Sequence, residues 1–291
     1  MIAAVVGDDA VTCDDETPAP WWSFTKTVLA AAALRMVAAG RIPLDTPLRG
    51  RTFTLRQVLQ HRAGLADYGS LPAYHAAVAA GDPPWPVAEL LRRVGAEQLR
   101  FEPGEGWAYS NIGYLLVRTL IEEIADEPLA PALRRLVFDP LGVTGVTVAC
   151  TPADLDATAW RNPDRYHPGW VYHGLLLGSA TSAALVLHHL LAGRLLPQAL
   201  TAAMRQPYPV EGSVPGRPWG TAGYGLGLMI GSGEPAGRYE GHTGMGPGST
   251  AAVFQRTDPD AARPPRTAAV LAAGHAAGVV ERRAMALAAG T

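Results

Sequence analysis

Short apolar runs of strand length occur at the two ends of the chain. Residues 2–6 and 10–13 flank an Asp-containing turn, a pattern typical of a β-hairpin. Towards the C-terminus, strand-like runs are separated by Gly, Pro and polar residues, and a helical pattern ends the chain. We therefore expect strands at residues 223–230, 251–255 and 267–272, followed by a helix at residues 279–289.

Between these ends, apolar positions recur with helical spacing. The first helix is predicted from Ser23 to Ala39, because helix-forming residues dominate this stretch and Gly40 follows as a C-terminal stop signal. Further helices are predicted at residues 55–61, 87–94, 112–126, 129–137 and 180–191.

The order of these elements indicates how the chain is organised. Strands at both ends with helices between them predict an α+β fold in which one sheet joins the N- and C-terminal segments. We place a discontinuous sheet domain at residues 1–54 and 207–291, and a mostly helical domain at residues 55–206. No internal repeat or low-complexity linker separates them, so the two parts are expected to interlock.

Composition and charge exclude several classes of protein. The chain has 291 residues, 48% of them hydrophobic and 17% charged, which is typical of a globular protein rather than a disordered one. Its formal net charge is -2 and it has no block of basic residues, so nucleic acid is not expected as a partner. The acidic N-terminal stretch lacks the basic and apolar regions of a secretory signal, which predicts a cytoplasmic location.

Two further features argue against a membrane span and against metal or disulfide chemistry. Residues 174–193 form the longest weakly charged stretch, but their serine, threonine and histidine side chains favour a buried helix over a membrane span. Cys13 and Cys150 are the only cysteines and form no C-x-x-C pair, so neither a disulfide framework nor a thiolate zinc site is indicated. We expect neither a metal nor another cofactor.

The chain contains a single lysine. Of its 24 basic residues Lys26 alone is not arginine, and lysine is the cationic side chain that can lose its proton when it is buried. In the tetrad Ser23-Phe24-Thr25-Lys26, helical spacing brings the serine and the lysine to one face. A lysine of lowered pKa can deprotonate a serine and make it a nucleophile. A serine helix cap with an exposed lysine would give the same tetrad, so other motifs must decide.

A second polar motif, Tyr109-Ser110-Asn111, follows a turn rich in glycine and proline and precedes the predicted helix at residues 112–126. Tyr109 could relay a proton to a leaving group, and Asn111 could bind the substrate's carbonyl group or hold Lys26 in place. The alternative interpretation is an interfacial tyrosine beside an asparagine helix cap.

A third motif, Gly241-His242-Thr243-Gly244, adjoins a strand. Small residues there let the backbone approach a ligand closely. His242 could offer a donor near the first two motifs, and the backbone N–H of Met245 could complete an oxyanion hole with that of Ser23. The order of the three motifs, at a helix start, in a loop and beside a strand, favours catalysis over coincidence.

Aromatic and histidine side chains outside the motifs carry weaker signals. Residues 160–173 are rich in both, and these side chains either line the mouth of a cleft or pack in the core. We interpret His61, His75 and His275 as structural or surface residues.

Together the three motifs resemble the signature boxes of the serine β-lactamase and penicillin-binding-protein superfamily. The branch they most resemble holds class C β-lactamases, D-alanyl-D-alanine carboxypeptidases and β-lactamase-like esterases, and the likeness extends over residues 23–248. It includes residues 55–65, which are similar to the segment after the nucleophile helix, and residues 101–114, which lead into the tyrosine box. The resemblance implies a β-lactamase/transpeptidase-like fold: an antiparallel sheet flanked by helices, a mostly helical domain, and an active site in the cleft between them.

The resemblance also implies acyl transfer through a covalent serine ester. Ser23 would be the nucleophile, Lys26 its activating base and Tyr109 the acid/base partner. The groups that position the substrate would be Asn111, His242, Thr243 and Gly244, and the backbone N–H groups of Ser23 and Met245 would bind the oxyanion.

The third box begins with His242, where class C β-lactamases have lysine. Because a histidine is often uncharged at neutral pH, this box does not provide a fixed cation for a substrate carboxylate. We therefore expect an esterase or amidase for small acyl substrates, with small-molecule esters, amides or β-lactams as binding partners. The alternatives are a true β-lactamase or D-alanyl-D-alanine carboxypeptidase, and a non-catalytic binding protein that keeps the fold.

Overall fold

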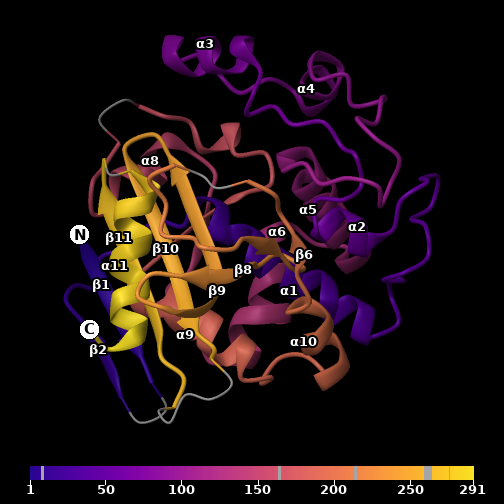
Figure 1. The fold of residues 1–291 in the computed structure, drawn as a ribbon. Helices are drawn as coiled ribbons and strands as arrows, with labels where there is room; N and C mark the ends of the chain where they lie inside the picture. The colour runs from indigo at the N-terminus through magenta and orange to yellow at the C-terminus, as the bar shows by residue number, and fades with distance from the viewer. Residues whose placement is uncertain (8–9, 163–164, 213–214, 259–263, 275) are drawn as a thin grey trace.

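Strands from the two ends of the chain pair in one antiparallel sheet. The structure is a computed structural model that describes residues 1–291 apart from residues 8–9, 163–164, 213–214, 259–263 and 275. Within the described residues, eight antiparallel strands form one sheet in the order β2-β1-β11-β10-β9-β8-β7-β6 (Figure 1). Their bounds are β1 Ile2–Val6, β2 Val11–Cys13, β6 Tyr208–Pro209, β7 Gly223–Tyr224, β8 Met229–Gly233, β9 Gly237–Gly246, β10 Ser249–Arg256 and β11 Thr267–Ala273.

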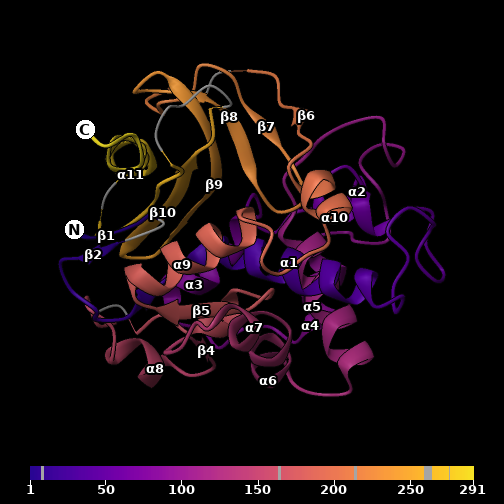
Figure 2. The same cartoon turned by 90° about the horizontal axis from the view of Figure 1, so that it is seen from below.

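Helices cover both faces of this sheet. Helix α11 (Ala277–Ala289) packs on β10 and β11 from one side, and helix α9 (Ala180–Leu191) packs on β1, β10 and β11 from the other (Figure 2). Strands β10 and β11 are therefore buried along nearly their whole length, which explains why their sequences read as continuous apolar runs rather than alternating ones. Pairing of Ile2 with Leu271 joins the N-terminal hairpin to the C-terminal strands.

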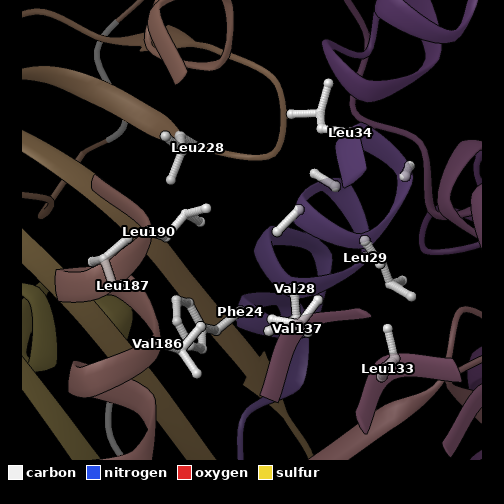
Figure 3. Packing of buried hydrophobic residues seen from close by; sticks show 14 of the residues in the cluster. Phe24, Val28, Leu29, Leu34, Leu133, Val137, Val186, Leu187, Leu190 and Leu228 are labelled. Carbon is white, nitrogen blue, oxygen red and sulfur yellow. The ribbon is translucent and has the colours of Figure 1, made fainter. Parts of the chain in front are cut away.

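Helix α1 (Thr25–Ala38) runs through the middle of the molecule. Nearly all its residues are buried, because the helix is apolar on all sides and has packing partners on all sides. Figure 3 shows its side chains gathered with those of α9 and of the segment around Leu133 in one apolar cluster. The helix was predicted from Ser23, but Ser23 lies in a separate 3-10 turn, η1 (Trp22–Phe24), which leads into it.

Further helices and a second sheet of three strands, in the order β3-β5-β4, complete the fold. The strands are β3 Ala19–Pro20, β4 Thr147–Ala149 and β5 Leu175–Gly178. The helices are α2 Leu55–Leu59, α3 Pro72–Ala80, α4 Val87–Arg93, α5 Asn111–Ala125, α6 Leu129–Leu133, α7 Asp139–Leu141, α8 Pro152–Asp156 and α10 Gln198–Met204. Among the described residues, no helix combines the length and apolar composition needed to cross a membrane.

Two segments differ from the sequence prediction. Residues 174–193 were interpreted as a buried helix rather than a membrane span, but the stretch begins with β5; α9 follows at the predicted residues 180–191, after Ser179, whose hydroxyl accepts the N–H of Ser182 as a helix cap. Residues 223–230 form two short strands, because the turn between them places Gly227 at φ 78°. A Cβ at Gly227 would lie 2.5 Å from that of Ala30, so this turn packs directly on α1.

The division into a sheet domain at residues 1–54 and 207–291 and a helical domain at residues 55–206 stays a prediction. Helix α9 lies within the predicted helical domain but packs on the sheet. One apolar cluster also includes side chains from both parts.

Candidate active site

The serine of the first motif sits in a strained turn. Trp22, the residue before it, has φ 47°, a left-handed backbone conformation that is costly for a tryptophan. The indole Nε1 of Trp22 donates a hydrogen bond of 2.9 Å to Ser249 Oγ on β10, which holds the turn against the sheet. Strain of this kind is common where a reactive side chain must be presented at a fixed place.

Lys26 lies next to this serine in a fully buried position. Its Nζ is 3.0 Å from Ser23 Oγ and 3.2 Å from Nε2 of His173. Burial lowers the pKa of Lys26 to about 7, and the negative charge of Asp67 opposes this shift only in part. A large fraction of Lys26 is therefore neutral at physiological pH and can accept a proton from Ser23.

Tyr109 completes the contacts of the serine hydroxyl. Its OH donates a hydrogen bond of 3.0 Å to Ser23 Oγ. Burial raises the pKa of Tyr109, so the phenol is protonated and available as an acid. The imidazole of His61 lies 4.4 Å from the Tyr109 ring, centroid to centroid, and supports it from behind. His61 is thus a buried structural residue beside the site.

The helix cap of the second motif is its serine, not its asparagine. Ser110 Oγ accepts the N–H of Gly113 and donates to the carbonyl of Ala66, so it fixes the start of α5. Asn111 is the first residue of the helix, and its backbone N–H donates to Oδ1 of Asp67 at 2.8 Å.

His242 on β9 is held as a neutral imidazole. Its Nε2 lies 2.8 Å from the hydroxyl of Tyr224, and its Nδ1 lies 2.8 Å from the carbonyl of Thr243, so Nδ1 carries the proton and Nε2 accepts one. Burial and the nearby charge of Lys26 lower the pKa of His242 to about 3. The first residue of the third motif is therefore uncharged at neutral pH.

The glycines of the third motif let β9 touch the nucleophile turn. A Cβ at Gly244 would lie 2.4 Å from the backbone N of Ser23, and one at Gly246 would lie 2.3 Å from the ring of Trp22. Any larger residue at either place would force the strand and the turn apart. The glycines are therefore explained by close approach of two backbones.

Met245 follows Gly244 on β9, and Gly244 lies against the backbone of Ser23. The N–H of Thr243 points to the β8 side, where it contacts Sδ of Met229, and the paired register of β8 and β9 ends at Met229 and Gly241. Because alternate residues of a strand point their N–H groups to the same side, the N–H of Met245 faces this same edge, beyond the last paired residue. The placement suits the predicted pairing of the Met245 and Ser23 N–H groups as an oxyanion hole.

Two cavities meet at Ser23 and Met245. The larger, about 710 Å³, is lined on its catalytic side by Tyr109, Arg217 and Thr243, with further walls from β7 and β8. The smaller, about 240 Å³, is mainly aromatic. Its lining includes Trp22, Tyr68, Tyr74, Asn111, Tyr166 and His173. A ligand could therefore place one part on each side of Ser23.

Three residues of the site carry no motif signal. His173 contacts Lys26, Tyr224 contacts His242, and Glu281 on α11 accepts a hydrogen bond from Oγ1 of Thr243. Within the stretch at residues 160–173, His173 and Tyr166 line the smaller cavity. Their neighbours Trp170 and Tyr172 are buried in an apolar cluster. The stretch thus contributes both to the cleft and to packing.

Two further histidines were interpreted as structural or surface residues. His75 lines the smaller cavity, and His275 lies outside the described residues. In the part of the chain that the structure describes, no group of three His, Cys, Asp or Glu side chains is arranged to hold a metal ion.

The fold and the clustered motifs define a class, the serine hydrolases of the β-lactamase and penicillin-binding-protein type. A model of the family described as Beta-lactamase matches residues 1–290, and the chain belongs to this family. The family predicted from the three motifs is therefore confirmed.

Relatives and solved structures agree with this assignment. The chain is 32% identical to esterase EstB of Burkholderia gladioli over 141 residues, which are 42% of this chain and 36% of the esterase. A D-stereospecific amidohydrolase from Streptomyces sp. matches 100% of this chain and 94% of its own, with a TM-score of 0.79 and 22% identity. D-amino acid amidase from Ochrobactrum anthropi SV3 matches 95% of this chain and 88% of its own, with a TM-score of 0.77 and 20% identity. At these identities the two structures show the fold, which is the predicted antiparallel sheet flanked by helices.

Proposed function

We propose that the protein is an esterase or amidase for small acyl substrates and that it acts through an acyl-enzyme on Ser23. The observation that carries the proposal is the pair of contacts to Ser23 Oγ: Lys26 Nζ and the hydroxyl of Tyr109 each lie 3.0 Å away. One of these groups is a base with a pKa of about 7, and the other is a protonated acid. This combination activates a nucleophile and protonates a leaving group at the same place.

The reaction follows from these contacts. Neutral Lys26 takes the proton of Ser23 as Oγ bonds to the substrate's carbonyl carbon, and the electron pair of the C=O bond moves to the oxygen. The backbone N–H groups of Ser23 and Met245 stabilise that oxyanion. When the intermediate collapses, Tyr109 protonates the departing oxygen or nitrogen, and the ammonium of Lys26 returns a proton to Tyr109. Water then attacks the ester, with the same groups acting in reverse.

The two cavities suggest how a substrate is oriented. Tyr109 lines the larger cavity, and a leaving group must sit next to the acid that protonates it, so the larger cavity holds the leaving group. The acyl part then occupies the smaller aromatic cavity beside Asn111, whose side chain is placed to position it. We expect acyl groups of limited size, because this cavity has a volume of about 240 Å³.

A true β-lactamase or D-alanyl-D-alanine carboxypeptidase is a weaker candidate. The substrates of both carry a carboxylate beside the bond that breaks, and His242 is held neutral where a cation would bind it. Small esters and amides need no such cation.

A cytoplasmic location, as the sequence predicts, is part of the proposal.

The decisive test is covalent labelling and turnover at Ser23. Incubation with p-nitrophenyl butyrate should add a butyryl mass to the peptide that contains Ser23, and Ser23→Ala should abolish both the label and p-nitrophenol release. Ser70→Ala, which removes an exposed serine, is the matched control and should behave as the wild type. Faster hydrolysis of nitrocefin than of short-chain esters would favour the β-lactamase alternative, and unchanged turnover in Ser23→Ala would refute the mechanism.

A further inference from the structure

A buried carboxylate stands behind the wall of the larger cavity. Glu281 lies on α11 with an exposed side-chain fraction of 0%, and Nε of Arg217 donates to its Oε2 at 2.8 Å. The Nη2 group of Arg217 donates to the other oxygen, Oε1, so the pair is bidentate. Oγ1 of Thr243 donates to the same Oε1. The carboxylate of Glu281 thus accepts hydrogen bonds from both the guanidinium group of Arg217 and the hydroxyl group of Thr243.

These two donors are the groups that would recognise a carboxylate on a ligand. An arginine fork matches the geometry of a carboxylate, and a hydroxyl adds a third hydrogen bond. Arg217 and Thr243 both line the larger cavity, next to Ser23. In the structure, however, their donors point to Glu281.

Among the described residues of the cavity wall, no further cation is available to bind a ligand carboxylate. Among the described residues that line the larger cavity, the basic side chains are Arg217 and His242. The geometry of its two ring nitrogens holds His242 neutral, and the charge of Arg217 is balanced by Glu281. A carboxylate that enters would lose its hydration and meet a negative group across Thr243, at a cost that no free cation offsets.

We propose that Glu281 is a specificity residue, an internal carboxylate that occupies Arg217 and Thr243 and so excludes leaving groups that carry a carboxylate. The larger cavity then accepts uncharged leaving groups such as simple alcohols, phenols and amines. The proposal rests on the proposed function, because it assigns the larger cavity to the leaving group of that reaction.

Glu281 also ties α11 to β9, so a structural role must be separated from a role in specificity. A purely structural residue would change the stability of the fold and lower the turnover of every substrate in the same proportion. A specificity residue changes the ratio between two substrates. The quantity to measure is therefore the ratio of the kcat/KM values for two substrates.

The probes are 3-acetoxybenzoate and methyl 3-acetoxybenzoate, whose acetyl esters release phenols of similar size with and without a carboxylate. The kcat/KM of each is divided by its rate of alkaline hydrolysis to remove intrinsic reactivity. We expect the wild type to prefer the methyl ester at least about tenfold, a difference of about 1.4 kcal/mol. In Glu281→Gln, Arg217 and Thr243 become available to a ligand, and the preference should fall at least about tenfold through a lower KM for 3-acetoxybenzoate.

Two controls make the outcome decisive. Glu89→Gln removes a carboxylate that pairs with Arg93 on the distant helix α4, and the ratio should stay that of the wild type. Glu281→Asp keeps the negative charge and should retain the preference for the methyl ester. If Glu281→Gln does not fold, the wild-type ratio decides, because equal rates for the two esters already overturn the proposal.

An unchanged ratio in a folded Glu281→Gln also overturns it. Failure of the proposed function would look different: neither ester would be turned over, or turnover would survive Ser23→Ala. Failure of the specificity proposal alone would leave turnover that depends on Ser23 and does not distinguish the two esters.

Discussion

Lys26 shows how burial alone can turn a cation into a base. Its side chain is enclosed by the tyrosine rings of Tyr109 and Tyr114, with the ammonium nitrogen 5.0 and 5.7 Å from their centroids. The neutral histidine His173 is within 3.2 Å of it. A carboxylate in direct contact would have kept Lys26 protonated, and the nearest acidic influence, Asp67, acts only at longer range.

The pH dependence of turnover should report this lysine. We expect kcat/KM for a neutral ester to rise with pH, reach half of its maximum near pH 7 and stay level above it, because protonated Lys26 cannot take the proton of Ser23. Asp67 raises the pKa of Lys26, so Asp67→Asn should move the midpoint to lower pH. Asp82→Asn, at an exposed position, should leave it in place. A midpoint that moves to higher pH in Asp67→Asn would contradict this account.

His173 should act as a positioning residue for Lys26. Replacement by phenylalanine removes the acceptor 3.2 Å from Lys26 Nζ, and we expect kcat to fall about tenfold or more with little change in KM. His173→Gln keeps an acceptor and should recover part of the loss. The matched control is His189→Phe on α9, where the ring nitrogen Nδ1 lies 3.1 Å from the carbonyl oxygen of Leu141. Equal losses in both His173 variants would show that the histidine serves packing alone.

At the scale of elements, the site depends on the contact between β9 and η1. Gly244 and Gly246 allow the strand to lie against the turn that holds Ser23, and Ser23 and Met245 line the same cavity. At Gly244 the contact is with backbone atoms of Trp21 and Ser23, which cannot move aside in the way that a long side chain can.

Gly244→Ala should therefore damage both stability and catalysis. The added Cβ would lie 2.4 Å from the backbone N of Ser23 and 2.5 Å from the carbonyl O of Trp21, and overpacking of this kind costs about 1–3 kcal/mol. We expect a lower melting temperature and a kcat/KM reduced more than the stability loss explains. Gly7→Ala, where a Cβ meets nothing within 4 Å, is the control. Wild-type kcat/KM in Gly244→Ala would refute the close approach.

The sequence predicted those helices and strands whose formation depends on residues close together in the chain. Helix α9 was predicted at its observed bounds because its apolar positions recur with helical spacing, and the predicted α+β fold with flanked antiparallel sheet is confirmed. The stretch at residues 223–230 was not resolved into two strands, because the turn at Gly227 depends on packing against Ala30, nearly two hundred positions earlier.

The site residues also divide into those that a short sequence motif predicts and those that meet only in the folded chain. Ser23 and Lys26 could be predicted because helical spacing places them together, and Tyr109 because its motif has a recognisable neighbourhood. His173 meets Lys26 across 147 positions of sequence, and Glu281 meets Thr243 across 38. Such contacts arise only when the sheet and the helices have assembled, so no short sequence pattern predicts them.

At the scale of the whole molecule, burial of Lys26, the proposed catalytic base, lowers the free energy of unfolding. An unfolded chain holds its lysine protonated up to about pH 10.5, whereas the folded chain releases this proton near pH 7. Between these values the unfolded state binds one proton more, so the free energy of unfolding rises with pH. Below about pH 7 the full penalty of a buried ammonium is present.

Lys26→Met should therefore stabilise the protein while abolishing turnover. We expect its free energy of unfolding to exceed that of the wild type by several kcal/mol below pH 7, since each pKa unit corresponds to about 1.4 kcal/mol. The difference should shrink towards pH 10. Urea unfolding at a series of pH values measures it, and a gap that is constant over this range would contradict a neutral buried lysine.

The tryptophan before the nucleophile has a consequence for how this family can diversify. Trp22 holds the turn with Ser23 against Ser249 and Gly246, on the same β9–β10 hairpin that carries Met245, so the proposed nucleophile and oxyanion donor are packed together. The outer wall of the larger cavity comes instead from residues around β6 and β7, including Val210, Trp219 and Thr221. A lineage can therefore exchange wall residues and acquire new leaving groups while the catalytic spacing is inherited unchanged.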